Sequence, residues 1–329
     1  MTSSSSANGS IKKNGFKFSA DGLQNLTIFG LLVLMVIIAP IIEPKFLGIQ
    51  NISNVLMQIS SIVIVSSVIT IVLNTGNLDL SVGGVGAMAG VLYAVFARAG
   101  MPVYLSALLA IICGGFIGFS NGIIISTFRL PSFIITIATM YIARGIAFIG
   151  AEGSVITSGL PGDFSNLGEG FLGPIPLPLV YALVFFIVFL FIQNMTVLGK
   201  QAYAIGSNIK AAEFSGINIK KSVTIIFMLA GLAAAFAGVV VSARFNQADC
   251  RILPGFEIDV VIASVLGGTS ISGGRGTVIG MVIGALILGI LTNILNMEGL
   301  ILYYQYVIKG ILLVVAIVYN NAMRKAIKI

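Results

Sequence analysis

The sequence predicts an all-α polytopic membrane protein, and three observations support this fold class. Of the 329 residues, 57% are hydrophobic and only 9% are charged, and the mean hydropathy is +1.08. Soluble globular domains do not have such a composition. Apolar runs of about 20 residues, each long enough to cross a bilayer as a helix, recur along the chain. No polar stretch is long enough to form a separate soluble core, so we expect one embedded unit and any enzymatic activity on another chain.

Ten membrane helices are predicted, at residues 23–42, 52–73, 80–97, 103–127, 131–150, 177–193, 222–243, 258–268, 277–295 and 300–319. The eighth is the least clear, because its apolar run is too short to span unless it begins in 244–257 or is broken. The first run is longer than that of a signal peptide and has no cleavage site after it, so we expect it to remain. Residues 1–22, rich in Ser, Asn and Lys, predict a disordered tail, and residues 23–329 the membrane domain.

Basic residues gather on one side of this topology. The expected cytoplasmic side carries Lys12, Lys13, Lys17, Arg129, Lys200, Lys210, Lys220, Lys221, Arg275, Arg324, Lys325 and Lys328, and the outer side carries Lys45, Arg98, Arg244 and Arg251. Because Lys and Arg are enriched in cytoplasmic loops, the bias predicts that both termini and the loop 196–221 are cytoplasmic.

What the composition lacks excludes several function classes. The chain has no histidine, which removes Ser-His-Asp and Cys-His catalysis and zinc sites built on imidazole. Cys113 lies in an apolar run and Cys250 in a polar loop, so we expect free thiols. The net charge of +7 comes from residues scattered at segment ends, which indicates membrane topology and not nucleic-acid binding. We expect no cofactor and no metal.

The polar loop at residues 200–221, KQAYAIGSNIKAAEFSGINIKK, carries four lysines between two apolar segments. Asn208 is suited to cap a short helix over residues 209–215, and Gly216 to end it in the left-handed conformation. Such a helix on the cytoplasmic surface would link the membrane part to a soluble partner. A plain solvated connector is the alternative, and the spacing alone does not decide between them.

Two glycine-rich polar junctions, at residues 74–84 and 266–276, are also expected on the cytoplasmic side. Glycine permits tight turns and broken helices, which is how membrane proteins place irregular backbone along a water-filled path. Asp79 is the only charge over a long apolar region, and its alternative role is to cap the helix that begins there. The second junction lacks the Gly-x-x-x-x-Gly-Lys-Ser/Thr spacing of a nucleotide-binding loop.

Arg144 and Lys309 are placed inside predicted spans. A charge at the centre of a membrane helix costs about 2.5–3.5 kcal/mol on insertion scales, so each is expected to have a partner. Glu298 and Glu152 are candidates, and both a structural contact and a role in translocation remain open. Small residues predict close helix packing at Gly231, Ala233, Ala234, Ala235, Gly238, Gly280, Gly284 and Gly289.

Four segments together resemble a known family: NLDLSVGG at 77–84, YAIGSNIKAAEFSGI at 203–217, VLGGTSISGGRGTVIG at 265–280 and YYQYVIKGILLVVAIV at 303–318. They resemble the inner-membrane permease of bacterial ABC importers for ribose and related sugars. The resemblance implies a permease that pairs with a second permease copy or paralogue, rests on ABC ATPase subunits and receives substrate from a periplasmic binding protein. It also implies that the loop 196–221 holds a coupling helix, with Ala211, Ala212, Glu213 and Gly216 where the family contacts its ATPase.

Branched-chain amino-acid permeases share the wider superfamily, so the substrate class stays open, and Cys250-Arg251 departs from the family pattern. An ion-coupled carrier is disfavoured because the acidic residues lie at segment ends. Helices 2–5 and 7–10 of the prediction flank the central loop and enter from opposite sides, which predicts an inverted repeat with the path near the interface of its halves. The candidates for the path or its gates are Asp79, Asn246, Gln247, Asp249, Gly268 and Gly274. The sequence decides neither the sugar nor whether the two permeases are identical.

Overall fold

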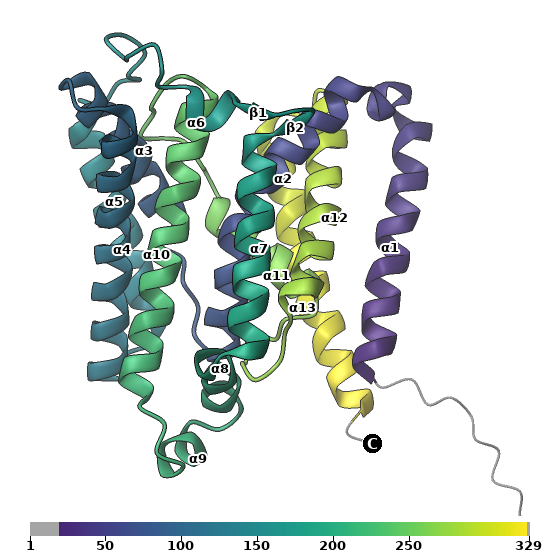
Figure 1. The fold of residues 1–329 in the computed structure, drawn as a ribbon. Coiled ribbons are helices and arrows are strands. Elements are labelled where there is room, and N and C mark those ends of the chain that lie inside the picture. Colours follow the sequence, from purple (N-terminus) through teal and green to yellow (C-terminus); the bar gives the residue numbers. More distant parts are fainter. Residues whose placement is uncertain (1–19, 328–329) are drawn as a thin grey trace, which may run out of the picture.

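The computed structural model describes residues 20–327, which form a bundle of helices (Figure 1). The principal helices are α1 (Ala20–Ile42), α2 (Ile49–Asn74), α3 (Val82–Arg98), α4 (Val103–Phe128), α5 (Ser132–Gly150), α7 (Leu177–Met195), α10 (Ile219–Arg244), α11 (Phe256–Leu266), α12 (Val278–Met297) and α13 (Leu302–Ile327). The shorter elements are η1 (Pro44–Leu47), α6 (Asn166–Glu169), α8 (Val197–Ser207), α9 (Ile209–Phe214) and the hairpin of β1 (Phe171–Leu172) and β2 (Ile175–Pro176).

Seven helices in the described part of the chain are long and apolar enough to cross a membrane: α2, α4, α5, α7, α10, α12 and the 302–319 part of α13. The Ile28–Ile42 part of α1 and the whole of α3 are shorter apolar helices. The protein is therefore a polytopic all-helical membrane protein, as predicted. The number of ten crossings stays a prediction.

The two ends of the bundle differ in what they carry. One end, called here the α9 end, carries α8 and α9, and the start of α1 and the end of α13 lie there too (Figure 1). The other, called here the hairpin end, carries β1 and β2.

Several predicted boundaries need correction. Within the described residues α1 starts at Ala20, before the predicted helix start at residue 23, whereas the predicted tail lies mostly outside the described residues and stays a prediction. The predicted loop 196–221 is mostly helical, since it contains α8, α9 and the start of α10. Thr196 begins α8, where its side-chain oxygen accepts a hydrogen bond from the Gly199 N–H (3.3 Å). Helix α13 continues past residue 319 to Ile327.

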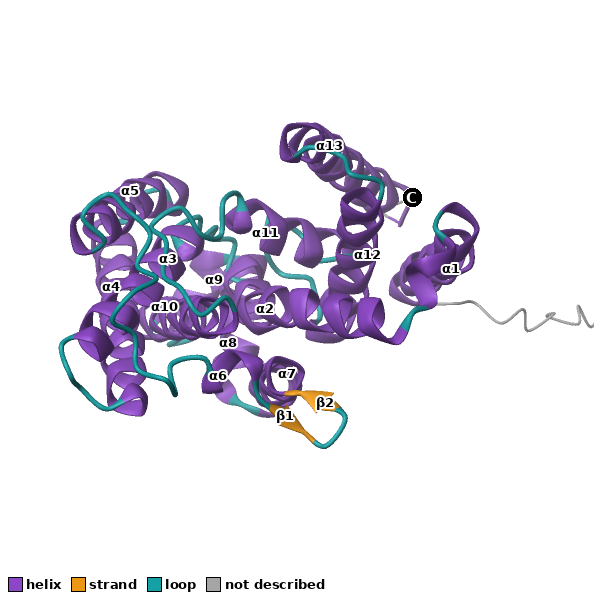
Figure 2. Cartoon of the chain, turned by 90° about the horizontal axis from the view of Figure 1, so that it is seen from above, coloured by secondary structure: helices purple, strands orange, loops and turns teal. Residues whose placement is uncertain are grey.

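Helices α2 and α10 form the centre of the bundle. In their most apolar 18-residue windows, 83% of α2 and 72% of α10 is buried, against 17% for both α5 and α13. Helix α10 packs against α3 and α4, and α2 against α7, α11 and α12. Seen from above, α5, α11 and α13 lie on one side of this centre and α7 on the other (Figure 2). The sparsely buried faces of α5 and α13 are thus left without a cover from this chain.

The predicted small residues do set the closest helix contacts. Gly231 of α10 packs against Gly114 and Gly118 of α4, and a Cβ on Gly231 would overlap the Gly114 carbonyl. Gly284 of α12 meets the Ala263 carbonyl of α11 in the same way. In lipid, where burial of apolar surface does not drive helices together, such close backbone packing is a main source of association.

The order of elements in the first set, α2 to α5, recurs in the second, α10 to α13. In each set a long helix is followed by an extended stretch, a shorter helix and two further helices, and the sets run in opposite directions (Figure 1). The stretch 75–81 enters the bundle from the α9 end and the stretch 245–255 from the hairpin end. Irregular backbone at this depth must be paired with protein groups or line a water-filled cavity.

Candidate functional site

The short helix α9 lies outermost at the α9 end (Figure 1). The side-chain oxygen of Asn208 accepts a hydrogen bond from the Ala211 N–H (3.0 Å), and Gly216 has a φ of 78°. The cap at Asn208 and the left-handed conformation of Gly216 are what the sequence predicts for the start and end of this helix. The local residues alone were therefore enough to locate it.

The surface of α9 is only partly what the resemblance implies. Ala211, Glu213 and Gly216 are exposed, and Glu213 forms an ion pair with Arg129 at the end of α4 (3.2 Å). Ala212 is 3% exposed, so its side chain faces this chain and does not offer a contact to a partner.

Phe214, which the sequence analysis overlooked, is 92% exposed at the tip of α9. Its signal was a phenylalanine within the short predicted helix of a lysine-rich loop. Because aromatic side chains are common at the centres of protein interfaces, its place at a protruding tip makes Phe214 a candidate anchor for a partner.

Behind α9, three segments of the chain meet at one carbonyl, an arrangement named here the Gly276 junction. The side chains of Asn74 (3.2 Å), Gln193 (3.2 Å) and Tyr203 (2.6 Å) all donate to the Gly276 carbonyl oxygen. The Gly274 N–H donates to the Asn74 carbonyl (2.9 Å). The end of α2, the end of α7 and the middle of α8 are thereby joined to the loop between α11 and α12.

Close backbone contact completes the junction. A Cβ on Gly206 of α8 would overlap the Asn74 carbonyl, and one on Gly273 would lie 2.8 Å from the Gly76 nitrogen. The two glycine-rich junctions that the sequence predicts separately therefore touch each other and α8. Burial raises the pKa of the Tyr203 hydroxyl, which keeps it protonated as a donor at physiological pH. Gly268, with a φ of 92°, lies just beyond Gly267, the residue that caps the end of α11.

Asp79 lies fully buried in the extended stretch before α3. The helix begins at Val82, so Asp79 is not its first residue. Its Oδ1 accepts hydrogen bonds from the N–H (2.8 Å) and the hydroxyl (2.6 Å) of Ser81. Its Oδ2 has no hydrogen-bond partner within residues 20–327. The Leu78 N–H donates to the Ser132 hydroxyl of α5 (2.9 Å), which fixes this stretch to α5.

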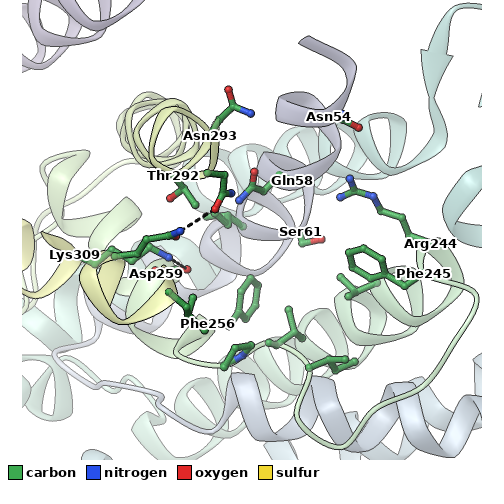
Figure 3. Close-up of a pocket in the computed structure, with 18 of the residues that line it drawn as sticks. Asn54, Gln58, Ser61, Arg244, Phe245, Phe256, Asp259, Thr292, Asn293 and Lys309 are labelled. Carbon is green, nitrogen blue, oxygen red and sulfur yellow. Dashed lines mark hydrogen bonds and ion pairs between the residues drawn. The ribbon is translucent and has the colours of Figure 1, made fainter. Parts of the chain in front are cut away.

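A cavity of about 620 Å³ lies at the hairpin end (Figure 3). It is lined by Asn51, Asn54, Gln58, Ser61 and Ile62 of α2; Val241 and Arg244 of α10; Phe245, Gln247, Ile252, Leu253 and Pro254 of the following stretch; Phe256 and Asp259 of α11; Thr292, Asn293 and Asn296 of α12; and Leu302, Gln305 and Lys309 of α13. Amide side chains predominate among its polar groups. A few placed polar groups in a concave site of this size are typical of a small-molecule binding site.

The two basic residues predicted inside spans have partners, although not the expected ones. Lys309 pairs with Asp259 on the cavity wall (2.8 Å), and these side chains are only 12% and 14% exposed. The Arg144 guanidinium of α5 donates to the carbonyls of Cys250 (3.1 Å), Ile252 (3.1 Å) and Leu253 (3.0 Å). Glu152 and Glu298 were the wrong candidates, because three of the four acceptors are backbone atoms far along the sequence.

Of the three predicted outer-loop residues, only Gln247 lines the cavity. Asn246 is exposed with a φ of 47°, and the Asp249 carboxylate accepts a hydrogen bond from the Arg251 N–H (2.9 Å). Cys113 and Cys250 are free, as predicted.

The polar residues of α2 were not predicted as functional from the sequence. Asn51, Asn54, Gln58 and Ser61 recur at spacings of three, four and three, which places them on one helix face. Gln305 and Lys309 of α13 are likewise four apart. A polar stripe within an apolar helix was the available signal, and only the fold could show that these stripes face each other.

The chain is similar to known transport proteins over most of its length. Residues 51–317 match the protein family described as the permease component of branched-chain amino acid transport systems. The ribose import permease protein of Bacillus subtilis is 37% identical over 300 residues, which cover 91% of this chain and 93% of that protein. The L-arabinose ABC transporter permease protein of Azospirillum brasilense is 34% identical over 87% of this chain and 85% of its own length. The D-allose transport system permease protein of Escherichia coli is 31% identical, covering 95% and 96%. No solved structure matches the chain.

Proposed function

Because the chain belongs to the family of permease components of branched-chain amino acid transport systems, we propose that it is the permease subunit of an ATP-driven importer for a monosaccharide. The relatives named for ribose, L-arabinose and D-allose match this chain over most of their length. As a permease subunit the chain is not itself an enzyme, and ATP hydrolysis belongs to separate ATPase subunits. A binding protein on the outer side delivers the sugar.

The observation that carries this proposal is that α9 is exposed and follows directly on α8, which is hydrogen-bonded to the loop between α11 and α12. Helices α8 and α9 together are called here the arm. A partner that moves α9 also moves α8, and α8 is joined through Tyr203 to the Gly276 junction. We assign α9 as the coupling helix, with Ala211, Glu213, Phe214 and Gly216 at the contact with the ATPase and Ala212 holding the helix to the bundle.

The orientation follows from charge. Lysines at the α9 end favour a cytoplasmic position for that end and for both termini, with the protein in the bacterial inner membrane. The hairpin end then faces the periplasm, where Asn246, Gln247 and Asp249 are available to a docked binding protein.

The uncovered faces of α5 and α13 favour a second permease, either another copy or a paralogue, packed against that side. The translocation path then runs between the cavity at the hairpin end and the Gly276 junction. Gly274 and Gly268 belong to its gate at the α9 end, and Asp79 lies beside it.

The lining of the cavity favours a sugar over a branched-chain amino acid. A sugar hydroxyl both donates and accepts hydrogen bonds, as the amides of Asn54 and Gln58 do. A branched aliphatic side chain would need only the apolar part of this lining and would leave the amides without partners.

Uptake by the reconstituted transporter tests the proposal. The permease, its ATPase and its binding protein are placed in proteoliposomes, with labelled D-ribose, L-arabinose, D-allose and L-leucine as separate probes. We expect uptake of a sugar that requires both ATP and the binding protein. Uptake of leucine alone, or uptake driven by an ion gradient without the ATPase, contradicts it.

A further inference from the structure

We infer that the cavity at the hairpin end is a binding subsite of the permease itself for one neutral monosaccharide, with Asn54, Gln58 and Ser61 as its hydroxyl-binding residues. This inference deepens the proposed function and rests on it. It adds a site on this chain that recognises the sugar after the binding protein has released it.

The first support is that these three side chains face the cavity without partners. Among residues 20–327, no hydrogen bond involves the side chains of Asn54, Gln58 or Ser61, although Ser61 is buried. Other serines within α2 are paired differently: Ser60 and Ser67 donate to carbonyls one turn earlier, at 2.6 Å and 2.7 Å. Buried polar groups are usually hydrogen-bonded, so the unpaired Ser61 hydroxyl at the inner end of the stripe is available to a ligand or to the water that the ligand displaces. Gln58 is half-buried and Asn54 is exposed, so the stripe leads from the surface down to Ser61.

The second support is that four neighbouring amide side chains, those of Asn51, Asn293, Asn296 and Gln305, are hydrogen-bonded to one another and hold the walls. Asn51 and Asn293 exchange two hydrogen bonds between α2 and α12 (3.0 and 2.9 Å), and Gln305 donates to Asn296 (2.8 Å). Hydrogen bonds therefore fix the walls of the cavity, while the side chains of Asn54, Gln58 and Ser61 have no hydrogen-bond partner among the described residues. Binding energy is gained when such groups are held in place before the ligand arrives.

The third support is the charge of the lining. Asp259 and Lys309 neutralise each other on one side of the cavity, and Arg244 lies on the other side with its guanidinium 5.4 Å from the Phe245 ring (Figure 3). A neutral polyol needs no countercharge, whereas an anionic sugar phosphate would find one unpaired cation at most. The rings of Phe245 and Phe256 offer apolar surface to the C–H groups of a sugar. The volume of about 620 Å³ lies within the range of small-molecule sites.

Saturation-transfer NMR with D-ribose, on the permease in lipid nanodiscs without ATPase and binding protein, measures this site directly. We expect transfer to the ribose protons. We expect Gln58→Ala and Ser61→Ala each to raise the dissociation constant about 2- to 10-fold, the effect of removing one hydrogen bond. Asn166→Ala, an exposed amide of α6 at the same end, is the matched control and should bind as wild type. Equal thermal midpoints of the variants exclude misfolding.

The outcomes separate this inference from the proposed function. If the wild-type transporter takes up ribose while the isolated permease gives no transfer signal, or while both variants bind as wild type, the subsite is refuted and the function stands. If ribose binds and the variants weaken it but no sugar is taken up by the full transporter, the proposed function fails. Displacement of ribose by L-leucine or by ribose 5-phosphate overturns the neutral sugar as the ligand class.

Discussion

At the scale of single residues, the tip of α9 combines Phe214, which is 92% exposed, with a charged pair, Glu213 and Arg129, that is itself well exposed. Exposed ion pairs contribute at most about 1 kcal/mol to stability, so the fold gives little reason for either feature. Both are better explained by a partner that buries them. A buried aromatic anchor ringed by polar contacts is the usual centre of a protein interface.

We therefore expect Phe214→Ala and Glu213→Lys to leave the permease folded but uncoupled. Exposed substitutions of this kind change the free energy of unfolding by within about 0.5 kcal/mol. Co-purification of the ATPase and its stimulation by the loaded binding protein are the two measurements. Phe171→Ala, an exposed phenylalanine at the hairpin end, serves as the control. Wild-type coupling in both α9 variants would mean that this loop is only a connector.

Ala212→Trp is unsuitable as a test of coupling, because Ala212 is buried and a bulky replacement disrupts the packing of α9 itself.

A second residue-scale prediction concerns Arg144. Its three hydrogen bonds hold the stretch of residues 250–253, which forms one wall of the cavity. Arg144→Met leaves the carbonyls of Cys250 and Ile252 without a donor among the described residues, whereas the Leu253 carbonyl keeps the Phe256 N–H (3.3 Å). The cost is about 1–3 kcal/mol for each buried group that water cannot reach. We expect a lower thermal midpoint together with faster proteolysis at residues 245–255. Arg98→Met, at an exposed arginine near the same end, should change neither, and an unchanged cleavage rate in Arg144→Met argues against the anchoring role.

At the scale of elements, the Gly276 junction joins α8, which precedes the proposed coupling helix α9, to the core. Tyr203→Phe removes only the hydroxyl that donates to the Gly276 carbonyl (2.6 Å), and α8 keeps its packing. We expect ATP hydrolysis to persist but to lose its dependence on the loaded binding protein, since the arm no longer reports on the loop between α11 and α12. Tyr181→Phe is the matched control, because its ring packs on Phe236 while its hydroxyl has no hydrogen-bond partner among the described residues. Intact stimulation in Tyr203→Phe shows that coupling takes another route.

The glycines of this junction are poorer probes than the sequence suggested. Gly274 has a φ of 75°, and a Cβ there would lie 2.7 Å from the Ser207 hydroxyl. Gly274→Val therefore strains the backbone and the packing together. Loss of transport in that variant does not distinguish a gate from a misfolded loop.

Elements differed in how well the sequence predicted them, for a physical reason. Helix α9 was predicted at once because its start and end depend on local groups, Asn208 and Gly216. The starts of α3 and α11 were not, because the extended stretches before them are fixed by Ser132, Thr136 and Arg144, all on α5. The cavity could not be predicted for the same reason. The polar stripe of α2 is visible in the sequence, but which helices face it depends on contacts between distant segments.

At the scale of the whole molecule, the two sets α2–α5 and α10–α13 place α2 and α10 side by side at the centre, and each set opens toward the opposite end. The stretch 75–81 enters from the α9 end beside the Gly276 junction, and the stretch 245–255 enters from the hairpin end beside the cavity. The proposed translocation path therefore has an extended stretch in place of a helix at each of its ends. Transporters built from inverted repeats commonly place their binding sites beside such interrupted segments.

This arrangement requires that α11 and the stretch before it together cross the membrane, although α11 has only 11 residues. Single-cysteine labelling tests it in a background with Cys113→Ala and Cys250→Ala. Lys210→Cys and Arg275→Cys, both exposed at the α9 end, should react only with reagents that reach the cytoplasm. Gly162→Cys, which has open space around it, and Met101→Cys should react from the periplasm. Labelling of Arg275→Cys from the same side as Gly162→Cys would mean that α11 turns back without crossing, and the ten-crossing topology and the path drawn through it would both be wrong.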